Sequence, residues 1–355
     1  MNYITMKGNI LNINIPILSI VIVTNDRKED LRNLINSILK QKSIDKKLFE
    51  IIIVNNGKEI IDLIKSYEKK LNIRYIKNDK NLGASKGRNI GVRNSKGKYI
   101  LFLDDDNYLQ EKFILKDIVE KDIRLLEENN EIGAIRYATE YPIYKTGKRI
   151  GYKYTVCELD IKTKKYYDLV RNIELLRKNS VYFYLNHFAT CGVLIKKEAF
   201  EKINGFDENM FVYAEDIDLS IRLWINNYKV VLNPWIIIRH NETPKKRNNL
   251  WREYQMTKNQ ILMLYKNYPL FLFFLYLLNW LTIQSILSYK NLKQKEPNIS
   301  FLQMYFEFLK GAFHAFKLIF SGKIKRKPMS YKLWKYIRFE IPKENIKILK
   351  EKGLL

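Results

Sequence analysis

The sequence predicts an α/β fold in which a mostly parallel sheet is flanked by helices, followed by a helical C-terminal region. Three observations lead to this prediction: short apolar runs alternate with amphipathic segments, polar residues follow several of these runs, and an uncharged stretch lies in the last third. Strands that alternate with helices form βαβ units, whose right-handed crossovers build a parallel sheet. A chain of 355 residues is long enough for one large or two modest domains with a hydrophobic core.

Apolar runs in the first half predict buried strands, and the segments between them carry apolar residues at helical spacing. The predicted strands are Ile17–Val23, Ile51–Val54, Ile73–Ile76 and Tyr99–Leu103. The predicted helices are Lys28–Lys40, Glu59–Lys70, Ala84–Asn94 and Glu111–Glu127. A less regular region follows and contains one further predicted strand, Thr190–Ile195.

Three consecutive carboxylates, Asp104-Asp105-Asp106, follow the fourth apolar run. Their mutual repulsion is costly unless a cation neutralises it, and Mg²⁺ or Mn²⁺ is commonly held by one or two carboxylates together with substrate phosphates. The first two runs also end in polar residues, Thr24-Asn25 and Asn55-Asn56, although Asn25 or Asn56 alone can equally serve a turn or a helix cap. Ligands of open α/β sheets bind beyond the carboxyl ends of the strands, so we expect a metal and phosphate site there.

A second group of acids, Glu215, Asp216 and Asp218, lies at the start of a predicted helix in "AEDIDLSIRLW". Taken alone, such acids are typical of a first helical turn, where the helix dipole favours them. Downstream of a metal site they suggest a further function, because a carboxylate here can accept the proton of an attacking hydroxyl.

The last third is the most basic part of the chain. The net charge is +25, and residues 241–355 hold 22 Lys/Arg against 7 Asp/Glu, or +15 of that total. A polyanion such as nucleic acid or anionic lipid is one explanation, and biased genome composition is another.

The uncharged stretch 267–289 is long enough to span a bilayer. Pro269 interrupts it, however, and a single span would separate the basic clusters Lys245–Arg247 and Lys323–Lys327 onto opposite sides of the membrane. Helices lying in the membrane interface accommodate both clusters, so this arrangement is favoured over a single span or a buried helical hairpin.

The sequence excludes some classes of protein and location. The two cysteines, Cys157 and Cys191, form no pair motif and favour a reducing, intracellular compartment. The N-terminus lacks the pattern of a secretory signal. A dinucleotide-dependent dehydrogenase is excluded because "VTNDRKED", after the first predicted strand, contains no glycine.

Four segments follow one another along the chain: "SIVIVTNDRKEDLRNLINSIL", "FEIIIVNNG", "NLGASKGRNIGVRNSKGKYILFLDDD" and "GVLIKKEAFEKINGFDENMFVYAEDIDLSIRLWINNYKV". In this order they resemble the opening strand and helix, the base-contacting second strand, the approach to the Asp-X-Asp motif and the acceptor segment of family 2 inverting glycosyltransferases. The resemblance covers residues 18–240 and implies the nucleotide-diphospho-sugar transferase fold.

The resemblance implies a donor site for a nucleoside-diphosphate sugar, with a UDP- or dTDP-sugar favoured. Thr24 and Asn25 match the floor of the nucleotide pocket. Asn55 stands where the family usually has an Asp that contacts the uracil or thymine ring, and an uncharged Asn carbonyl leaves the base identity open. The other implied donor residues are Asn81, Arg88, Asn89, Asp104 and Asp105. For Arg88, a solvated surface ion pair is the alternative to donor binding.

The resemblance also implies a metal site for Mn²⁺ or Mg²⁺. Asp106 matches the residue that coordinates the ion, and Asp104 matches the one that holds the ribose or a metal-bound water. Asp105 could share either role. His240 matches a position where some members contact the metal or the diphosphate, although a partly buried histidine at a strand end is an alternative reading.

For catalysis, Asp216 matches the general base, and Glu215 is a neighbour that binds the acceptor or tunes the base. The region 137–184 is expected to shape the acceptor site. The acceptor-loop residues implied by the resemblance are Gly205, Phe206 and Asp207, with Glu215 beside them.

The segments "WREYQMTKNQILMLYKNYP" and "FLKGAFHAFKLIFSGK" resemble parts of bacterial enzymes that build cell-surface polysaccharides. This implies a glycan or lipid-linked acceptor, contact with an anionic membrane, and a peripheral or monotopic location on the cytoplasmic face of the bacterial inner membrane. The expected organisation is a nucleotide-sugar-binding half (1–130), an acceptor-binding half of the same catalytic domain (131–245), and a membrane-associating region (246–355).

Two other functions remain open from the sequence. A metal-dependent nucleic-acid phosphoryl transferase would also use clustered Asp and a basic surface. The positive charge is greatest outside the apparent catalytic half, so no nucleic-acid partner is expected. A non-catalytic membrane scaffold that retains the fold would explain the departure at Asn55, but the acids Asp104, Asp106 and Asp216 all persist.

Overall fold

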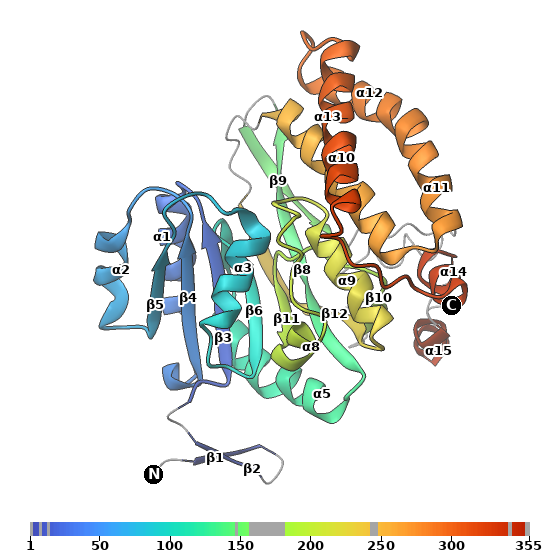
Figure 1. Ribbon diagram of the computed structural model, residues 1–355. Helices are drawn as coiled ribbons and strands as arrows, with labels where there is room; N and C mark the ends of the chain where they lie inside the picture. Colours follow the sequence, from blue (N-terminus) through green and yellow to red (C-terminus); the bar gives the residue numbers. More distant parts are fainter. Residues whose placement is uncertain are drawn as a thin grey trace.

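A mixed sheet forms the centre of the molecule, and helices cover both of its faces (Figure 1). The computed structural model describes residues 3–6, 9–12, 15–145, 148–155, 182–241, 248–339 and 343–351. Cys157, the cluster Lys245–Arg247 and the segment 156–181 of the expected acceptor region lie outside these residues. The strand order is β10-β12-β8-β11-β6-β3-β4-β5, with β7 paired to β12 and β9 paired to β8. The predicted fold class is confirmed.

The strands of this sheet divide into a parallel part and a mixed part. The parallel part consists of β3 (Leu18–Thr24), β4 (Phe49–Asn55), β5 (Ile73–Lys77) and β6 (Tyr99–Asp104). The mixed part consists of β7 (Asn107–Leu109), β8 (Ile132–Lys145), β9 (Lys148–Thr155), β10 (Phe183–Leu185), β11 (Val193–Lys196) and β12 (Lys229–His240). A separate hairpin pairs β1 (Tyr3–Met6) with β2 (Asn9–Asn12).

The helices that pack on this sheet lie close to their predicted positions. They are α1 (Lys28–Leu39), the 3₁₀ turn η1 (Lys46–Leu48), α2 (Ile61–Glu68), α3 (Gly83–Arg93), α4 (Ile114–Asp117), the π-helical turn η2 (Ile118–Asp122), α5 (Ile123–Glu128), α8 (Lys197–Lys202) and α9 (Glu215–Ile225). α2 begins later than predicted because the Glu59 carboxylate accepts the backbone N–H groups of Ile60 and Ile61. The predicted strand Thr190–Ile195 starts only at Val193, because Gly192 has a φ of +78°.

The apolar strand runs are buried because helices cover both sheet faces. Ile20, Ile22, Ile51 and Ile53 have no exposed surface. Strands buried on both faces read as continuous apolar runs instead of alternating ones, which is the pattern seen in the sequence. The long strands β8 and β12 were not predicted, because polar and aromatic residues interrupt their apolar pattern.

The parallel register brings the polar strand ends together at one edge. Thr24 lies beside Asn55 on the neighbouring strand, and Val23 lies beside Asp104 on the other side. At the same edge, the antiparallel pairing of β7 with β12 places His240 opposite Asn107. The expected convergence of strand ends is therefore present.

Helix α3 approaches the sheet closely because two of its glycines face β3. A Cβ atom on Gly87 would lie 2.7 Å from Val23 Cγ1, and one on Gly91 would lie 2.4 Å from Val21 Cγ1. Both distances are too short for real contacts, so only glycine permits this approach. The close packing carries Arg88, which lies between the two glycines, to the end of β6.

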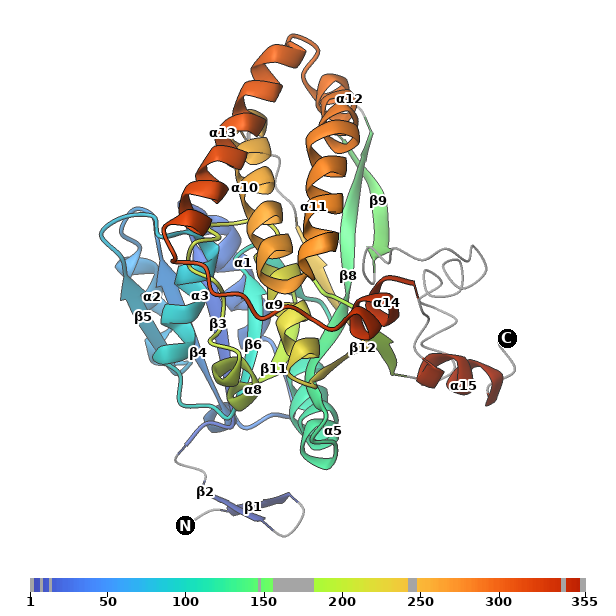
Figure 2. The same ribbon diagram turned by 45° about the vertical axis from the view of Figure 1, so that its right-hand side comes forward.

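The C-terminal region is helical, and its longest helices project from the sheet (Figure 2). It comprises α10 (Asn249–Asn267), α11 (Leu270–Asn279), the π-helical turn η3 (Trp280–Gln284), α12 (Ser285–Lys295), α13 (Phe301–Phe320), α14 (Tyr331–Phe339) and α15 (Lys343–Glu351). α13 starts with the reciprocal hydrogen bonds of a capping box between Ser300 and Gln303. At Gly311 it packs so tightly on α10 that an added Cβ would lie 2.5 Å from the Tyr254 carbonyl oxygen.

Within the described residues, one continuous helix, Leu270–Gln294, is long and apolar enough to cross a membrane. Only 17 % of its most apolar window is buried in the protein. The uncharged stretch is therefore largely an exposed helix, which argues against the buried hairpin considered from the sequence.

Gly91→Ala is predicted to lower the free energy of unfolding by about 1–3 kcal/mol, because the new methyl group overpacks Val21. The better helix propensity of Ala offsets up to about 1 kcal/mol of this loss. Urea unfolding of Gly91→Ala, Val21→Ala and the double variant measures the coupling. The double variant should be more stable than the sum of the single changes predicts, and strict additivity would contradict the packing argument.

Candidate active site

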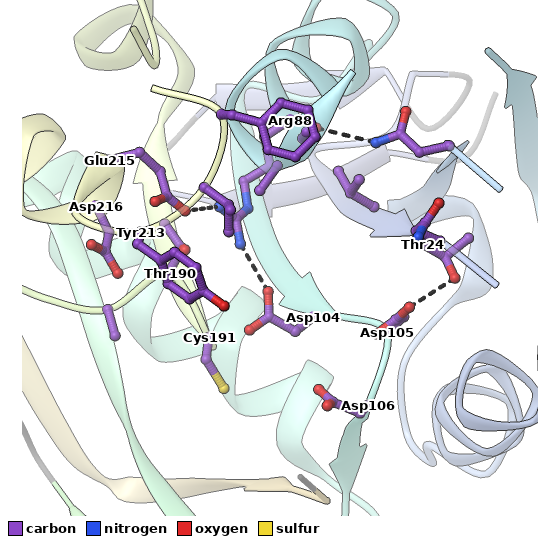
Figure 3. A pocket seen from close by; sticks show the side chains of 18 of the residues that line it. Thr24, Arg88, Asp104, Asp105, Asp106, Thr190, Cys191, Tyr213, Glu215 and Asp216 are labelled. Carbon is purple, nitrogen blue, oxygen red and sulfur yellow. Dashed lines mark hydrogen bonds and ion pairs between the residues drawn. The ribbon is translucent and has the colours of Figure 1, made fainter. Parts of the chain in front are cut away.

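A cavity of about 650 Å³ lies at the carboxyl ends of β3, β4 and β6. The loop 211–216 and the N-terminal part of α10 close it from the other side. Ten of the predicted site residues line it: Thr24, Asn25, Asn81, Arg88, Asp104, Asp105, Asp106, Glu215, Asp216 and His240. Figure 3 shows the three consecutive aspartates facing Glu215 and Asp216 across the cavity.

The three aspartates are held by different partners. Thr24 Oγ1 donates to Asp105 Oδ2 at 2.8 Å, and Arg27 Nη1 donates to Asp105 Oδ1 at 3.1 Å and also to Asp106. Burial and the charge of Asp106 raise the pKa of Asp105 to about 7, and burial also raises the pKa of Asp106. Although burial opposes it, the pKa of Asp104 is lowered by the His240 imidazole and the Arg88 charge.

The donor set at this edge fits a divalent cation. Asp106 is 3 % exposed, and its Oδ1 has no hydrogen-bond partner among the residues that the structure describes. The His240 imidazole Nε2 lies 3.3 Å from this oxygen and 3.7 Å from Asp104 Oδ2. Ligand atoms of Asp104, Cys191 and His240 all lie within 4.8 Å of one another. Carboxylate oxygens next to an imidazole are suitable ligands for Mn²⁺ or Mg²⁺.

Arg88 connects the two groups of acids (Figure 3). Its Nη2 donates to Asp104 Oδ1 at 2.9 Å, and its Nη1 donates to Glu215 Oε1 at 2.8 Å. The side chain is 9 % exposed, and the guanidinium carbon lies 5.5 Å from the centroid of the Phe206 ring. The alternative of a solvated surface ion pair is therefore wrong for Arg88.

Glu215 and Asp216 occupy the first turn of α9 but have different surroundings. Glu215 is buried and paired with Arg88, and burial followed by the charge of Asp216 raises its pKa to about 7. Asp216 lines the cavity, and its Oδ1 accepts from the Ile217 backbone N–H at 2.9 Å. Burial raises its pKa as well. Among the described residues, Glu215 is thus the acid that pairs with Arg88, and Asp216 has no such ion pair.

Five predicted site residues do not line the cavity: Asn55, Asn89, Gly205, Phe206 and Asp207. Both ends of the Asn55 amide are used internally, since its Oδ1 accepts from Gly57 and its Nδ2 donates to the Lys58 carbonyl and to Tyr75. The Asn89 amide likewise bonds both the N–H and the C=O of Phe206. The roles expected for these two residues therefore stay predictions.

The acceptor-loop residues face a different part of the molecule. Gly205 has a φ of +60°, and an added Cβ would lie 2.7 Å from Asn89 Oδ1. Asp207 Oδ2 accepts from Lys266 Nζ at 2.6 Å. Their expected contact with the acceptor also remains a prediction.

Comparison with known proteins decides the family. Residues 19–203, just over half of the chain, match the domain described as glycosyl transferase family 2. The chain belongs to glycosyl transferase family 2. Residues 174–246 of this glycosyltransferase also match a domain described as the N-terminal domain of galactosyltransferase.

Relatives of this glycosyltransferase occur in archaea and bacteria. An uncharacterized glycosyltransferase of Methanocaldococcus jannaschii is 27 % identical over 239 residues, which cover 67 % of this chain and 74 % of that protein. The poly(ribitol-phosphate) beta-N-acetylglucosaminyltransferase TarP of Staphylococcus aureus is 29 % identical over 171 residues, or 46 % of this chain and 50 % of TarP.

Solved structures share the fold of this glycosyltransferase at low sequence identity. The mannosyltransferase PcManGT of Pyrobaculum calidifontis, in complex with GDP-Man and Mn²⁺, superposes with a TM-score of 0.51 at 13 % identity, covering 85 % of this chain and 87 % of that one. GalNAc-T7 with UDP, GalNAc and Mn²⁺ gives 0.58 at 14 % identity, covering 87 % and 56 %. At these identities the likeness shows the fold alone.

Three residues at the site, Arg27, Trp251 and Asn259, were not predicted from the sequence. Arg27 binds Asp105 and Asp106, and its position in the loop after β3 could have identified it as a site residue. Trp251 of α10 also lines the cavity and packs edge-on against Phe211 and Tyr213, at centroid distances of 5.9 and 6.3 Å. No sequence signal links α10 to the loop it contacts.

Asn259, also on α10, fixes the loop that leads to the acids of α9. This fully buried side chain donates to the carbonyl oxygens of Val212 and Tyr213 at 2.8 and 2.7 Å. Tyr213 and Ala214, directly before Glu215, have φ values of +72° and +61°. Two consecutive left-handed residues other than glycine are strained, so surrounding contacts must hold them. Asn259 is therefore a positioning residue for α9.

Asn259→Ala is predicted to lower the kcat of the glycosyltransferase about tenfold to hundredfold, because the loop before Asp216 can relax. The KM for the sugar donor should change little, since Asn259 does not line the cavity. Steady-state kinetics measure both constants, with Asn291→Ala on the exposed surface of α12 as control. Equal changes of kcat in both variants, or a rise in donor KM alone, would contradict the positioning role.

Proposed function

We propose that this glycosyltransferase binds a nucleoside-diphosphate sugar and a divalent cation in the cavity and transfers the sugar, with inversion, to an acceptor hydroxyl. The observation that carries this proposal is the pairing of two groups of acids from distant parts of the chain around one cavity. Asp104, Asp105 and Asp106 lie on one side, Asp216 lies on the other, and Arg88 joins the two sides.

Asp104, Asp106 and His240 are the residues proposed to hold Mn²⁺ or Mg²⁺. Such a cation, when bound, neutralises the negative charge that develops on the departing diphosphate. The proposal is supported by Asp106 Oδ1, which has no hydrogen-bond partner among the described residues, and by the Mn²⁺ in the complexes of PcManGT and GalNAc-T7. Thr24, Asn25 and Asn81 line the same side of the cavity and are proposed to contact the donor.

The base of the nucleotide is proposed to be uracil or thymine. UDP in the GalNAc-T7 complex supports a uridine donor, whereas GDP-Man in the PcManGT complex supports a guanosine donor. Asn55 can contact a base only if its bond with the Gly57 N–H opens. Asn56, the next residue, already lines the cavity and holds its amide toward the Gly83 carbonyl.

Asp216 is proposed as the general base that accepts the proton of the acceptor hydroxyl. A base must keep a carboxylate available at the cavity, and Asp216 does so because Arg88 pairs with Glu215 instead. Burial raises the pKa of Asp216, which makes it a stronger base than an exposed aspartate. Glu215 is proposed to hold Arg88 in position and to border the acceptor.

The proposed acceptor is a glycan or a lipid-linked precursor of a cell-surface polysaccharide. The name of TarP, which describes transfer to poly(ribitol-phosphate), supports a surface polymer. The rim of the cavity includes Phe211, Tyr213 and Trp251, and aromatic rings of this kind pack well against the apolar faces of sugars.

Membrane association is proposed for the helices α11 to α13, with the protein peripheral or monotopic at the cytoplasmic face of a bacterial inner membrane. Large apolar side chains are exposed along these helices, among them Phe271 at 76 %, Leu302 at 77 % and Phe313 at 74 %. A contiguous exposed apolar surface marks a site of interaction with a protein or a membrane. Lysines on the same helices, such as Lys290 and Lys310, suit anionic headgroups.

Two substitutions are predicted to separate donor binding from chemistry. Asp106→Ala should abolish the Mn²⁺-dependent increase in affinity for a nucleoside diphosphate, because a carboxylate proposed to hold the cation is lost. Asp216→Asn should retain this binding but lose about 10²–10⁴-fold in turnover, because the base is removed. Calorimetric titration with UDP, dTDP, GDP and CDP, with and without Mn²⁺, measures the first effect, and product formation measures the second.

Glu29→Gln serves as the matched control for both, since this exposed carboxylate pairs with Arg32 on α1 and does not line the cavity. If folded wild-type protein binds none of the four nucleotides, the donor site is wrong. If Asp216→Asn retains full turnover, another group is the base.

Phe271→Ser combined with Phe274→Ser is predicted to weaken binding to lipid vesicles at least about tenfold, because each buried aromatic side chain contributes about 1.5–3 kcal/mol to insertion. Both side chains are more than half exposed, so the substitutions should not affect folding. Vesicle flotation measures the binding, and Phe113→Ser, at a half-exposed position away from these helices, is the control. Unchanged flotation of the double variant would refute the assignment of α11 to the membrane.

A further inference from the structure

A second pocket, of about 450 Å³, shares no lining residue with the active-site cavity. Its walls are formed by the end of α8, the acceptor loop 203–209, the C-terminal end of α9, Lys266 and the segment 323–327. In Figure 2 this segment belongs to the red chain that leaves α13 and crosses in front of α9 toward α14. We call it the basic pocket, because seven Lys or Arg residues and only two acids, Asp207 and Glu208, line it.

The two acids are already paired with cations in the described structure. Asp207 accepts from Lys266 Nζ, and Glu208 pairs with Lys86 and Arg93 outside the pocket. Lys323 and Lys325, by contrast, are exposed and have no acidic partner among the described residues. The pocket therefore carries an uncompensated positive charge.

Two arginines of the pocket retain unused hydrogen-bonding capacity. Arg222 donates to Asp218 and to the Ile203 carbonyl, yet its Nη2 is buried without a hydrogen-bond partner in the described part of the chain. Arg326 donates to the Tyr268 carbonyl at 2.8 Å and lies 4.7 Å from the Tyr265 ring centroid, while its Nη1 is also buried and unpartnered. Buried guanidinium nitrogens without acceptors are uncommon, and a planar guanidinium is well suited to an oxyanion.

Hydrogen bonds hold the walls of the basic pocket in place, so the pocket is formed before a ligand binds. The backbone N–H of Lys327 donates to the Lys266 carbonyl at 3.1 Å, and that of Met329 donates to the Asn267 carbonyl at 2.8 Å. Lys327 Nζ donates to Asn226 Oδ1 at 2.6 Å. These bonds attach the basic segment to the turn between α10 and α11 and to the end of α9.

Exposed apolar side chains flank the basic pocket within a few residues of its walls. Phe320, three residues before Lys323, is 83 % exposed. Leu270 and Phe271, just after the Tyr268 carbonyl that Arg326 contacts, are 53 % and 76 % exposed. A soluble phosphate needs no apolar surroundings, whereas a lipid presents its phosphate directly above a hydrocarbon layer.

We propose that the basic pocket binds the phosphate of an anionic lipid headgroup, with Arg326, Lys323 and Lys325 as its principal contacts. The proposal rests on the membrane association proposed above and extends it by assigning a headgroup site. Binding there would fix the acceptor loop 203–209 and the end of α9 relative to the membrane surface.

Flotation of the full-length protein with three kinds of vesicle tests this proposal. The vesicles contain phosphatidylcholine alone, phosphatidylcholine with phosphatidate, or phosphatidylcholine with oleate at the same surface charge. Phosphatidate vesicles should bind best. Lys323→Gln combined with Lys325→Gln should weaken that binding about tenfold or more, since each lysine near an anionic surface contributes substantially to affinity. Arg326→Lys should remove the preference for phosphatidate over oleate while keeping the charge.

Lys46→Gln combined with Lys47→Gln is the matched control, because these exposed lysines lie in η1, next to β4 and away from the C-terminal helices. Equal binding to phosphatidate and oleate vesicles, or an equal loss in the control pair, would overturn the proposal. Thermal stabilisation of the wild type but not of Arg326→Lys by inorganic phosphate, without a preference for phosphatidate vesicles, would assign the pocket to soluble phosphate and overturn the lipid assignment.

Nucleotide titration of the same variants separates this proposal from the proposed function. The Lys323/Lys325 variant should bind nucleoside diphosphate with Mn²⁺ as the wild type does. Absence of nucleotide binding in every protein would refute the donor site, while the vesicle comparison would still decide whether the basic pocket takes a lipid phosphate.

Discussion

The buried guanidinium of Arg88 is the interaction on which the rest of the site depends. It neutralises Asp104 at the end of β6 and Glu215 at the start of α9, and so connects the parallel part of the sheet to the first turn of α9. Removing one member of a buried ion pair leaves an uncompensated charge, which typically costs about 3–5 kcal/mol. The sequence meets this requirement with Gly87 and Gly91, which allow α3 to lie close enough to the sheet to deliver Arg88.

This arrangement also assigns different roles to two adjacent acids. Because Arg88 engages Glu215, the neighbouring Asp216 remains available at the cavity. The left-handed residues Tyr213 and Ala214 turn the chain into α9, and Asn259 of α10 holds that turn in place. The C-terminal region therefore supports the candidate site and also carries most of the exposed large apolar side chains among the described residues. A membrane bound to α11 and α13 would lie next to a helix that supports the acids of α9.

Much of the fold was predictable because the residue pattern of each segment agrees with its burial in the folded protein. The runs that became β3, β4, β5 and β6 are apolar throughout, as is typical of strands covered on both faces. The strands β8 and β12 were missed, because polar residues such as Arg136 and Asn233 interrupt their pattern. Both side chains are buried and donate to distant partners, the carbonyl oxygen of Gly192 and the carboxylate of Asp122, which no local pattern reveals.

Residue types at short spacings were enough to predict the parallel part of the sheet, the family and the two groups of acids. Which of those residues share a cavity depends on the packing of distant segments. It directs the amides of Asn55 and Asn89 to internal bonds, pairs Arg88 with both groups of acids, and brings Trp251 and Asn259 of α10 to the loop before α9. Such contacts join segments far apart in the chain, and their geometry is set by the packing of whole helices against the sheet, which short-range patterns do not record.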